Sequence, residues 1–591
     1  MAVEKLIVDH IDTWTTALQT RSTAGRGSSG KIDLYGIKKL RELILELAVR
    51  GKLVPQDPND EPASELLKRI AVEKAELVKQ GKIKKPKPLP EISEEEKPFE
   101  LPVGWEWVRL EKISTRIGSG STPKGGKNVY LETGVPFLRS QNIWNHGIKL
   151  EDIAFISSQT HNNMSNTHVM PNDILLNITG ASLGRCSIFP KTISEANVNQ
   201  HVTIIRLVSE DYVPFIHLAI ISPVIQREIW HRQVGMAIEG LSKKSLESFI
   251  FPIPPKNEQE SINKKVTELM SLCDQLEQHS LTSLDAHQQL VETLLTTLTD
   301  SQNADELAEN WARISEHFDT LFTTEASIDA LKQTILQLAV MGKLVPQDPN
   351  DEPASELLKR IAQEKAQLVK DGKMKKQKPL PPISDEEKPF ELPSGWEWCR
   401  LGSIFNFLNG YAFKSEWFSP AGLRLLRNAN IAHGVTNWKD VVYIPNEMRD
   451  DFENYVLSEN DIVISLDRPI INTGLKYAII RKSDLPCLLL QRVAKFKNYA
   501  NTVSNTFLTT WLKSYFFINS IDPGRSNGVP HISTKQLEMT LFPLLSQSEQ
   551  DRIILKANEL ISICEKLKYH IQTTQQTQLH LADALADAAI N

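Results

Sequence analysis

The chain has 591 residues, of which 41% are hydrophobic and 24% are charged, and its formal net charge is −6. These values are ordinary for a globular protein and exclude the fibrous and largely disordered classes, while the length predicts several domains. Five scattered cysteines, with no CxxC pair and no histidine cluster, indicate a reducing compartment and argue against structural zinc. The chain shows no signal-peptide pattern and no run of 18 apolar residues, which predicts a cytoplasmic protein that does not span a membrane.

The first elements along the chain are helical. Residues 1–20 place apolar side chains on one stripe, residues 34–49 repeat this spacing, and a charged helix is expected over 63–79. A stretch rich in proline and charge then continues to about residue 100 and is too polar to be a core element. Residues 1–100 are therefore predicted to form an N-terminal helical region followed by a solvated strap.

The same frame returns later in the chain. Residues 40–110 are repeated at 331–401 with 57 of 71 positions identical, and 51–71 returns unchanged as 342–362. Both copies end on the sequence GWEW, whose two indoles are expected to be buried and to anchor the strap. A chain that repeats its frame and varies the sequence between the copies is expected to present two different surfaces in one geometry.

Each frame copy is followed by an insert, at 101–255 and at 395–545. Short β-branched runs broken by Gly and Asn predict a small mixed α/β domain with a strand-rich core in each. The phrase L-R-x-x-N-I at 138–143 returns at 426–431, an offset of 288. The inserts are therefore expected to share a scaffold and to differ in their loops.

A long helix is predicted after each insert, at about 258–298 and from 550 to about 585. Apolar residues alternate by four and three in both helices, which indicates coiled-coil seams. The seam residues are Ile262, Val266, Leu269, Cys273 and Leu276 in the first helix, and Ile553, Ala557, Leu560, Cys564 and Leu567 in the second. Two such helices are expected to pair with each other, so that the repeats close into a ring about a pseudo-two-fold axis.

The predicted fold is α+β, with two globular mixed α/β domains separated by two long antiparallel coiled-coil helices. The central region, 256–394, is expected to contain the first long helix, a helical hairpin and the second strap. Residues 546–591 are expected to form the second long helix.

Two sequence patterns approach catalytic motifs. Residues 120–127 are similar to a phosphate-binding loop, but Asn128 stands where a hydroxyl residue would bind magnesium, which favours a Gly-rich surface loop, or one that contacts DNA phosphates. Asp57, Glu65 and Lys68 have the residue types of a nuclease site, but Glu65 and Lys68 form an ordinary i, i+3 pair on a predicted helix. No catalytic residue and no metal site is predicted.

Polar and basic loop residues of the inserts remain, of the kinds that read base edges and hold phosphates. The candidates in the first insert are Ser121, Thr122, Lys124, Lys127, Arg139, Gln141, Arg185, Asn199, Gln200, His201, Ser242 and Lys243. Those in the second insert are Asn409, Tyr411, Lys414, Arg427, Asn428, Arg468, Gln491, Arg492, Asn527, His531 and Lys535. Each is also compatible with a solvated surface residue, and Arg139 and Arg427, which lie in matching phrases, are alternatively scaffold ion-pair residues. The inserts are only mildly basic, which allows local positive patches.

These motifs together resemble those of the specificity subunit (HsdS) of type I restriction-modification systems. The resemblance covers nearly the whole chain and rests on the duplicated GKLVPQDP phrase, the W-E-W motif, the L-R-x-x-N-I phrase and FPIPPKNEQESI before the first long helix. The GKLVPQDP phrase points to the type IB subfamily. The second insert departs from the pattern and closes on FPLLSQSEQ, which affects the placement of that loop.

The resemblance implies that the inserts are target recognition domains, each reading one half of a split duplex DNA sequence in host defence and DNA methylation. It also implies that the long helices bind two methyltransferase (HsdM) subunits and that restriction and translocase (HsdR) subunits join the complex. S-adenosylmethionine, ATP and magnesium would then belong to the partner subunits, with no cofactor on this chain. Two alternatives are a two-domain protein-binding adaptor on a coiled-coil frame and a self-contained nuclease, which the missing metal site disfavours.

Overall fold

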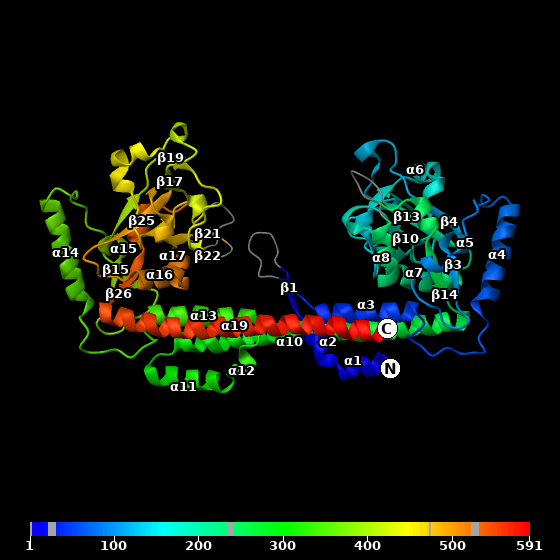
Figure 1. The fold of residues 1–591 in the computed structure, drawn as a ribbon, viewed down its shortest axis with the longest axis horizontal. Coiled ribbons are helices and arrows are strands. Elements are labelled where there is room, and N and C mark those ends of the chain that lie inside the picture. Colours follow the sequence, from blue (N-terminus) through cyan, green and yellow to red (C-terminus); the bar gives the residue numbers. More distant parts are fainter. Residues whose placement is uncertain (1–2, 22–30, 233–239, 472–473, 522–530, 591) are drawn as a thin grey trace. The chain divides into compact units, whose positions relative to one another are not determined.

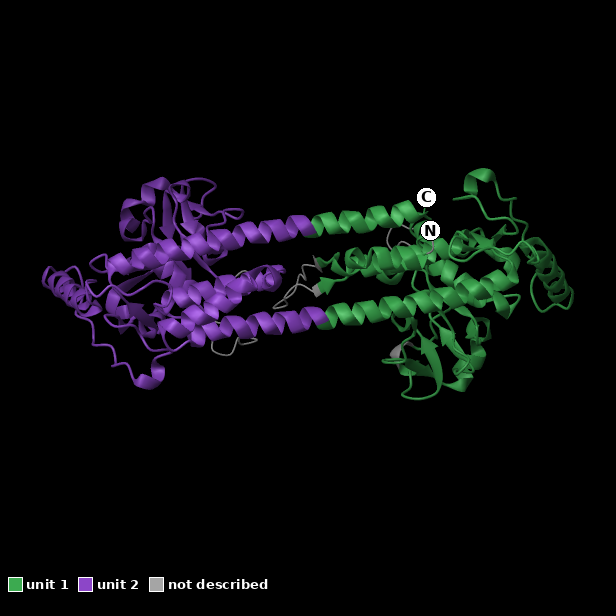
Figure 2. Cartoon of the chain, turned by 90° about the horizontal axis from the view of Figure 1, so that it is seen from below, with its two compact units in different colours: residues 1–21, 30–282, 575–591 green, residues 22–29, 283–574 purple. Residues whose placement is uncertain are grey.

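The computed structural model describes residues 3–21, 31–232, 240–471, 474–521 and 531–590. The chain divides into two compact units (Figure 2). Unit 1 comprises residues 1–21, 30–282 and 575–591, and unit 2 comprises 22–29 and 283–574. Each unit therefore contains one insert together with a part of each long helix.

The frame of unit 1 is helical, and its elements are α1 (Val3–Asp9), α2 (Ile11–Thr16), the hairpin of β1 (Gln19–Arg21) and β2 (Lys31–Asp33), α3 (Tyr35–Val49), α4 (Ala63–Lys79) and the first part of α10 (Lys256–Asp300). Helix α3 buries its apolar stripe and reaches both long helices through its polar side chains. Arg41 Nη2 lies 2.6 Å from Asp274 Oδ1 of α10, and Tyr35 Oη donates a 2.8 Å hydrogen bond to Asp583 of α19 (Gln547–Ile590). Helix α3 thus ties the two long helices together in this unit.

The insert of unit 1 holds two four-stranded sheets (Figure 1). The first is antiparallel, in the order β11 (Cys186–Ile188), β10 (Ile174–Asn177), β13 (Val202–Leu207), β4 (Ser114–Ser119). The second has the order β8 (Ala154–Ile156), β5 (Val135–Leu138), β12 (Ala196–Val198), β9 (His168–Val169), and β5 and β12 run parallel. Its remaining elements are β6 (Ile143–Trp144), β7 (Gly147–Ile148), α5 (Leu110–Ile113), α6 (Ser158–Asn163), α7 (Val213–Ile221), α8 (Pro223–His231) and α9 (Lys243–Glu247).

Unit 2 repeats this plan with different details. Its frame contains the end of α10, α11 (Ala304–Glu316), α12 (Phe318–Leu321), α13 (Glu325–Val340), α14 (Ala354–Lys370) and the start of α19. One sheet has the order β16 (Phe405–Asn409), β25 (Val493–Asn498), β20 (Ile462–Ser465), β23 (Tyr477–Ile479), β18 (His433–Gly434), and the other has the order β19 (Tyr443–Ile444), β17 (Leu423–Leu426), β24 (Cys487–Leu489). Its remaining elements are α15 (Leu401–Ile404), β21 (Ile470–Ile471), β22 (Gly474–Leu475), α16 (Asn505–Lys513), α17 (Tyr515–Ile521) and α18 (Thr534–Met539).

Each insert leaves and rejoins the frame through one two-stranded ribbon, β3 (Glu106–Arg109) with β14 (Ile250–Ile253) in unit 1 and β15 (Glu397–Arg400) with β26 (Leu541–Leu544) in unit 2. Trp105 Nε1 donates a 2.9 Å hydrogen bond to Glu258 of α10, and Trp396 donates an equal one to Glu549 of α19. We call this pair of contacts the Trp–Glu clasp. Trp105 is buried as predicted, whereas Trp107, the second indole of the motif, is only half-buried.

The turn that contains GKLV packs directly on the segment that leads into this ribbon. Gly51 has φ +69°, and a Cβ at this position would lie 2.5 Å from Cγ of Pro102. Gly342 has φ +71° and the same clearance from Pro393. Only glycine combines this left-handed backbone with so close an approach, which gives a physical reason for glycine in both copies.

The long helices pack together in unit 2. Their side chains meet α13 in one hydrophobic cluster, to which α10 contributes Val291 and Leu295 and α19 contributes Ile553 and Cys564. Helix α19 runs antiparallel to α13, because Lys332 pairs with Glu565, and Asp329 pairs with Lys568 one turn further along α19. The predicted α+β class with two strand-rich domains and two long helices is confirmed, and the seam of α19 packs on α13 as a third helix.

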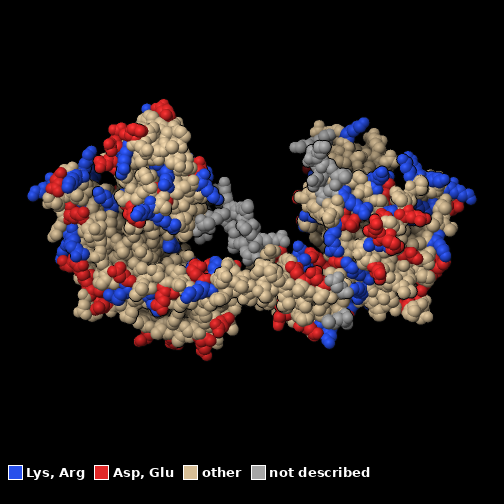
Figure 3. All heavy atoms as spheres, in the orientation of Figure 1, with Lys and Arg blue, Asp and Glu red and all other residues tan. Residues whose placement is uncertain are grey.

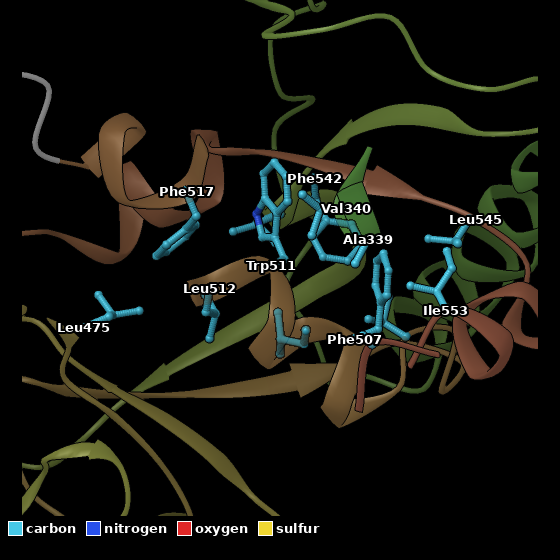
Figure 4. Packing of buried hydrophobic residues seen from close by; sticks show 14 of the residues in the cluster. Ala339, Val340, Leu475, Phe507, Trp511, Leu512, Phe517, Phe542, Leu545 and Ile553 are labelled. Carbon is cyan, nitrogen blue, oxygen red and sulfur yellow. The ribbon is translucent and has the colours of Figure 1, made fainter. Parts of the chain in front are cut away.

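The core of unit 2 continues from the frame into its insert (Figure 4). Phe507 and Trp511 of α16 each lie with their ring centroids 5.9 Å from that of Phe542 in β26. Ala339 and Val340 of α13 belong to the same cluster and are fully buried. Because frame and insert share one close-packed core, the body of the insert is held by the frame.

Candidate nucleic-acid interface

Loop segments from separate strands meet at one edge of the insert in unit 1. We call these segments the first polar edge, which consists of residues 120–122, 139–141, 178–180, 199–201 and 240–242. Backbone hydrogen bonds join them: Ser121 N donates to Val198 O at 3.1 Å, and Ile178 N donates to His201 O at 3.0 Å. Gly120 permits the first contact, since a Cβ there would lie 2.0 Å from Val198 O.

Unit 2 has the same arrangement in the second polar edge, which consists of residues 410–412, 427–429, 466–468, 490–492 and 531–533. Strand register establishes the equivalence, because Leu489 pairs with Leu426 as Val198 pairs with Leu138. The bridge between Thr179 and Gly240 likewise returns as a bridge between Asp467 and His531. The two edges thus share a backbone framework.

The side chains of the first polar edge form a connected chain of hydrogen-bonding groups. Thr179 Oγ1 lies 2.7 Å from His201 Nδ1, and Gln200 Nε2 lies 3.2 Å from His201 Nε2. Thr122 donates to the Gln200 side-chain oxygen. With His201 accepting from Gln200 through Nε2, its Nδ1–H donates to Thr179, so the framework selects one tautomer.

A stacked cation lies beside this chain. The Arg185 guanidinium carbon lies 3.8 Å from the ring centroid of Trp144, and Lys149 Nζ lies 4.3 Å from it. Trp144 Nε1 is itself fixed by a 2.8 Å hydrogen bond to the carbonyl oxygen of Gln141. Arg185 is therefore held against an aromatic face by a cation–π interaction.

The second polar edge is organised around Asp467, a residue absent from the sequence candidates. Asn428 Nδ2 donates to Asp467 Oδ2 at 3.1 Å, and Arg492 Nη1 lies 3.2 Å from the same oxygen. His531 Nδ1 lies 3.0 Å from Oδ1, within ion-pairing distance. Three candidates from three different loops are thus brought together on one carboxylate.

The matching arginines Arg139 and Arg427 fasten their own loops. Arg139 donates a 2.8 Å hydrogen bond to the carbonyl oxygen of Asp152, and Arg427 forms a 2.8 Å ion pair with Asp440, the equivalent position. Both guanidinium groups are thereby engaged with the protein, which favours the scaffold alternative for them.

Other candidates have local partners or are packed. Ser242 accepts from Ser245 N as the N-cap of α9, and Lys243 pairs with Glu247 at 3.5 Å. Tyr411 lies among aromatic rings, with its centroid 4.7 Å from that of Phe452.

The remaining candidates are placed as follows. Asn199 is half-buried at the end of β12, and Asn409 donates to Thr534 at 3.4 Å. Lys414 pairs with Glu416 at 3.4 Å. The side chains of Ser121, Lys124, Gln141, Arg468, Gln491 and Lys535 are exposed. Lys127 lies in a 3-10 turn but its side chain is outside the described residues, as is the whole of Asn527.

Basic and acidic side chains are interspersed on the surface. On the face drawn in Figure 3, basic and acidic side chains alternate over the described parts of both units. Positive charge on this face is therefore local, in keeping with the small net charges of the inserts.

Among the described residues, no group of three or more His, Cys, Asp or Glu is arranged to hold a metal ion, and no helix is long and apolar enough to cross a membrane. All five cysteines are unpaired and buried. Burial raises the pKa of Cys273 to about 11, which keeps this thiol protonated at neutral pH.

Comparison with known proteins assigns the family. Residues 102–286 match the family model described as "Type I restriction modification DNA specificity domain". Over the full length of both chains the protein is 70% identical to the type I restriction enzyme EcoAI specificity subunit and 48% identical to the EcoEI specificity subunit, both of Escherichia coli. The crystal structure of the HsdS subunit from Thermoanaerobacter tengcongensis is similar with 17% identity and a TM-score of 0.42, covering 84% of this chain and 98% of that one. The family predicted from the repeated motifs is confirmed: the chain belongs to the non-catalytic specificity subunits of type I restriction enzymes.

Proposed function

We propose that each polar edge reads one half of a split duplex DNA target. The observation that carries this proposal is one backbone framework present twice with different side chains. Thr179, His201 and Gly240 of the first edge are replaced by Asp467, Arg492 and His531 in the second. Hydrogen-bonding side chains on a fixed framework are what the reading of base edges requires.

We also propose that the frame carries two methyltransferase (HsdM) subunits and that restriction and translocase (HsdR) subunits join them in the cytoplasm. Equivalent grooves support two copies of one partner, one between α3, α8 and α10 in unit 1 and one between α13, α17 and α19 in unit 2. Each groove carries an exposed aromatic residue, Trp230 in the first and Tyr515 in the second. Such residues are frequent binding hot spots. S-adenosylmethionine, ATP and magnesium are then bound by the partner subunits.

Exchange of a whole insert tests the proposal. Residues 110–249 would be replaced by the insert of another specificity subunit, with the ribbon of β3 and β14 retained. The two ends of the insert pair across this ribbon, so a foreign insert can be joined without changing the frame. We expect the assembled complex to methylate a target altered in one half-site only. A change in both halves, or in neither, contradicts independent reading.

Single substitutions provide a sharper test. Gln200 and Gln491 are equivalent residues of the two edges, and each change to alanine should reduce discrimination in a different half-site by about 1–3 kcal/mol. Lys191→Ala and Lys482→Ala are the matched controls. Lys191 lies near the end of β10 that is far from the first polar edge, and Lys482 lies near the end of β20 that is far from the second. Binding of the methyltransferase complex to single-base variants of the target is the measurement. If no sequence-specific duplex binding is found for the wild type, a protein-binding adaptor is favoured instead.

A further inference from the structure

The second polar edge contains a charged cluster that the first lacks. The side chain of Asp467 is only 14% exposed, and Arg492, 63% exposed, lies against it through a single nitrogen. In the first edge the equivalent pair is Thr179 and His201, which are joined by a hydrogen bond without a carboxylate. The remaining donors of the Arg492 guanidinium are free to face a ligand, because only Nη1 contacts the carboxylate.

Backbone strain marks the same cluster. Arg492 has φ +72° and Arg468 has φ +46°, in the left-handed region that disfavours residues other than glycine. The residue equivalent to Arg468 in the first edge is Gly180, with φ +67°. Strain of this kind persists where the side chain is needed and clusters at binding sites. An arginine where the equivalent turn uses glycine indicates a role for its side chain.

The two arginines differ in how they are held. Arg492 is positioned by Asp467, which Asn428 also supports, so its direction is defined. No ion pair joins Arg468 to an acidic residue in the part of the chain that the structure describes, and its side chain is exposed. A group that reads a base has to be positioned, whereas a group that neutralises a phosphate acts as a point charge.

Building on the proposed function, we infer that Arg492 reads a guanine in the half-site of unit 2, that Asp467 is its positioning residue, and that Arg468 contacts a DNA phosphate. Arginine pairs with O6 and N7 of guanine through two parallel donors. Asp467 holds Nη1 and leaves the other guanidinium nitrogens for the base. The half-site of unit 1 is read without this cluster, since Thr179 and His201 occupy the equivalent positions.

The test uses the full chain assembled with its methyltransferase partner and a set of duplexes in which every base pair of the target is varied singly. Arg492→Ala should reduce discrimination at one G·C pair of one half-site by roughly 10- to 100-fold and leave the other half-site unchanged. Arg492→Lys should restore affinity but only part of the discrimination, because lysine lacks the planar fork. Lys482→Ala is the control.

Asp467→Ala tests whether Asp467 positions Arg492 or only stabilises the fold. Release of Arg492 should lower discrimination at the same G·C pair while non-specific binding is kept or increased, since a negative charge is removed from the edge. A structural defect would weaken both kinds of binding together. Uniform weakening by Asp467→Ala, or an Arg492→Ala effect spread evenly over all base pairs, overturns the inference.

Arg468→Gly tests the phosphate contact. Relief of the left-handed strain should leave thermal stability equal to or above that of the wild type. Affinity should fall about equally for all sequences, and the slope of log affinity against log salt concentration should decrease by about one. Loss of discrimination at a single base pair contradicts this role. If the wild-type complex shows no sequence specificity, the proposed function fails; if it is specific but these variants behave like Lys482→Ala, only the inference fails.

Discussion

At the residue scale, Gly51 and Gly81 distinguish two reasons for glycine, which are a left-handed backbone and the lack of room for a side chain. Both have a left-handed backbone, but a Cβ on Gly51 would meet Pro102 at 2.5 Å, whereas nothing lies within 4 Å of one on Gly81. Gly81→Ala should therefore cost about 1 kcal/mol of unfolding free energy, from backbone strain alone. Gly51→Ala should cost roughly 2–4 kcal/mol, because overpacking adds to the strain. Urea unfolding of the two variants gives the difference, and equal costs would show that the proline yields.

Glu258 is a buried carboxyl group of the Trp–Glu clasp. Burial raises the pKa of Glu258, and hydrogen bonds from Gln56 and Trp105 partly oppose this shift. A carboxyl whose pKa is raised on folding binds its proton more readily in the folded state, so its ionisation destabilises the fold above the folded pKa. The cost disappears as the pH falls through that value towards the unfolded one.

Glu258→Gln should accordingly match or exceed wild-type stability at neutral pH, and its advantage should shrink as the pH is lowered towards the unfolded value of 4.5. Glu258→Ala leaves the buried indole N–H of Trp105 without an acceptor and should cost about 1–3 kcal/mol at the acidic end of the range. Its cost should be smaller at neutral pH, because this variant also lacks the ionisation that destabilises the wild type there. Denaturant unfolding between pH 5 and 8 compares the three proteins. An advantage for the glutamine variant that grows on acidification would contradict the raised pKa.

At the scale of the element, the seam of the long helix α10 is the buried face that holds it in place. In α10, Leu269 is 2% exposed in the seam, whereas Leu272, one turn further on, is 36% exposed. Leu269→Ala should cost about 2–5 kcal/mol, because a buried side chain is lost and a cavity remains. Leu272→Ala is the control of equal chemistry and should cost less than about 1 kcal/mol. Similar costs for both would show that the seam does not carry the packing of the helix.

Elements with a strong period could be predicted from the sequence. The first long helix was expected from about residue 258 to 298 and extends over Lys256–Asp300, because its apolar repeat and its ends are local properties. The packing of its partner on α13 could not be predicted in this way. A periodic stripe shows that a helix buries one face, but not which neighbour covers it.

The candidate interface shows the same limit more strongly. Gln200 and His201 lie together on the first polar edge, and Gln491 and Arg492 lie together on the second, because short strands end at these places in each insert. Thr179 and Asp467 were missed, although comparing the inserts at the offset of 288 places them at equivalent positions. Their partners come from loops far apart in sequence, so no local pattern marks them.

At the scale of the whole molecule, both long helices belong partly to each unit. If they set the distance between the half-sites, the preferred spacing should follow their length. Half-site centres are expected about 34–36 Å apart, one turn of B-DNA. Four residues inserted between Leu284 and Val291 of α10, and four at the equivalent place in α19, add about 6 Å and about 40° of rotation.

The doubly extended protein should therefore prefer a spacer longer by one or two base pairs. Extension of α10 alone should weaken binding, because the other helix keeps its length. DNA binding would be measured against targets whose spacer is varied one base pair at a time. An unchanged optimum in the doubly extended protein shows that the helices do not determine the spacing.

The paired ribbons and the Trp–Glu clasp have a consequence for the gene. Identical stretches of protein sequence flank each insert on its N-terminal side, and the clasp residues Trp105 and Glu258 have counterparts 291 positions later in Trp396 and Glu549. Crossing-over within the DNA that encodes these stretches keeps the reading frame and rebuilds the same junction around whatever insert arrives. Inheritance can thus exchange inserts between related genes, and every recombinant begins with a junction that already folds.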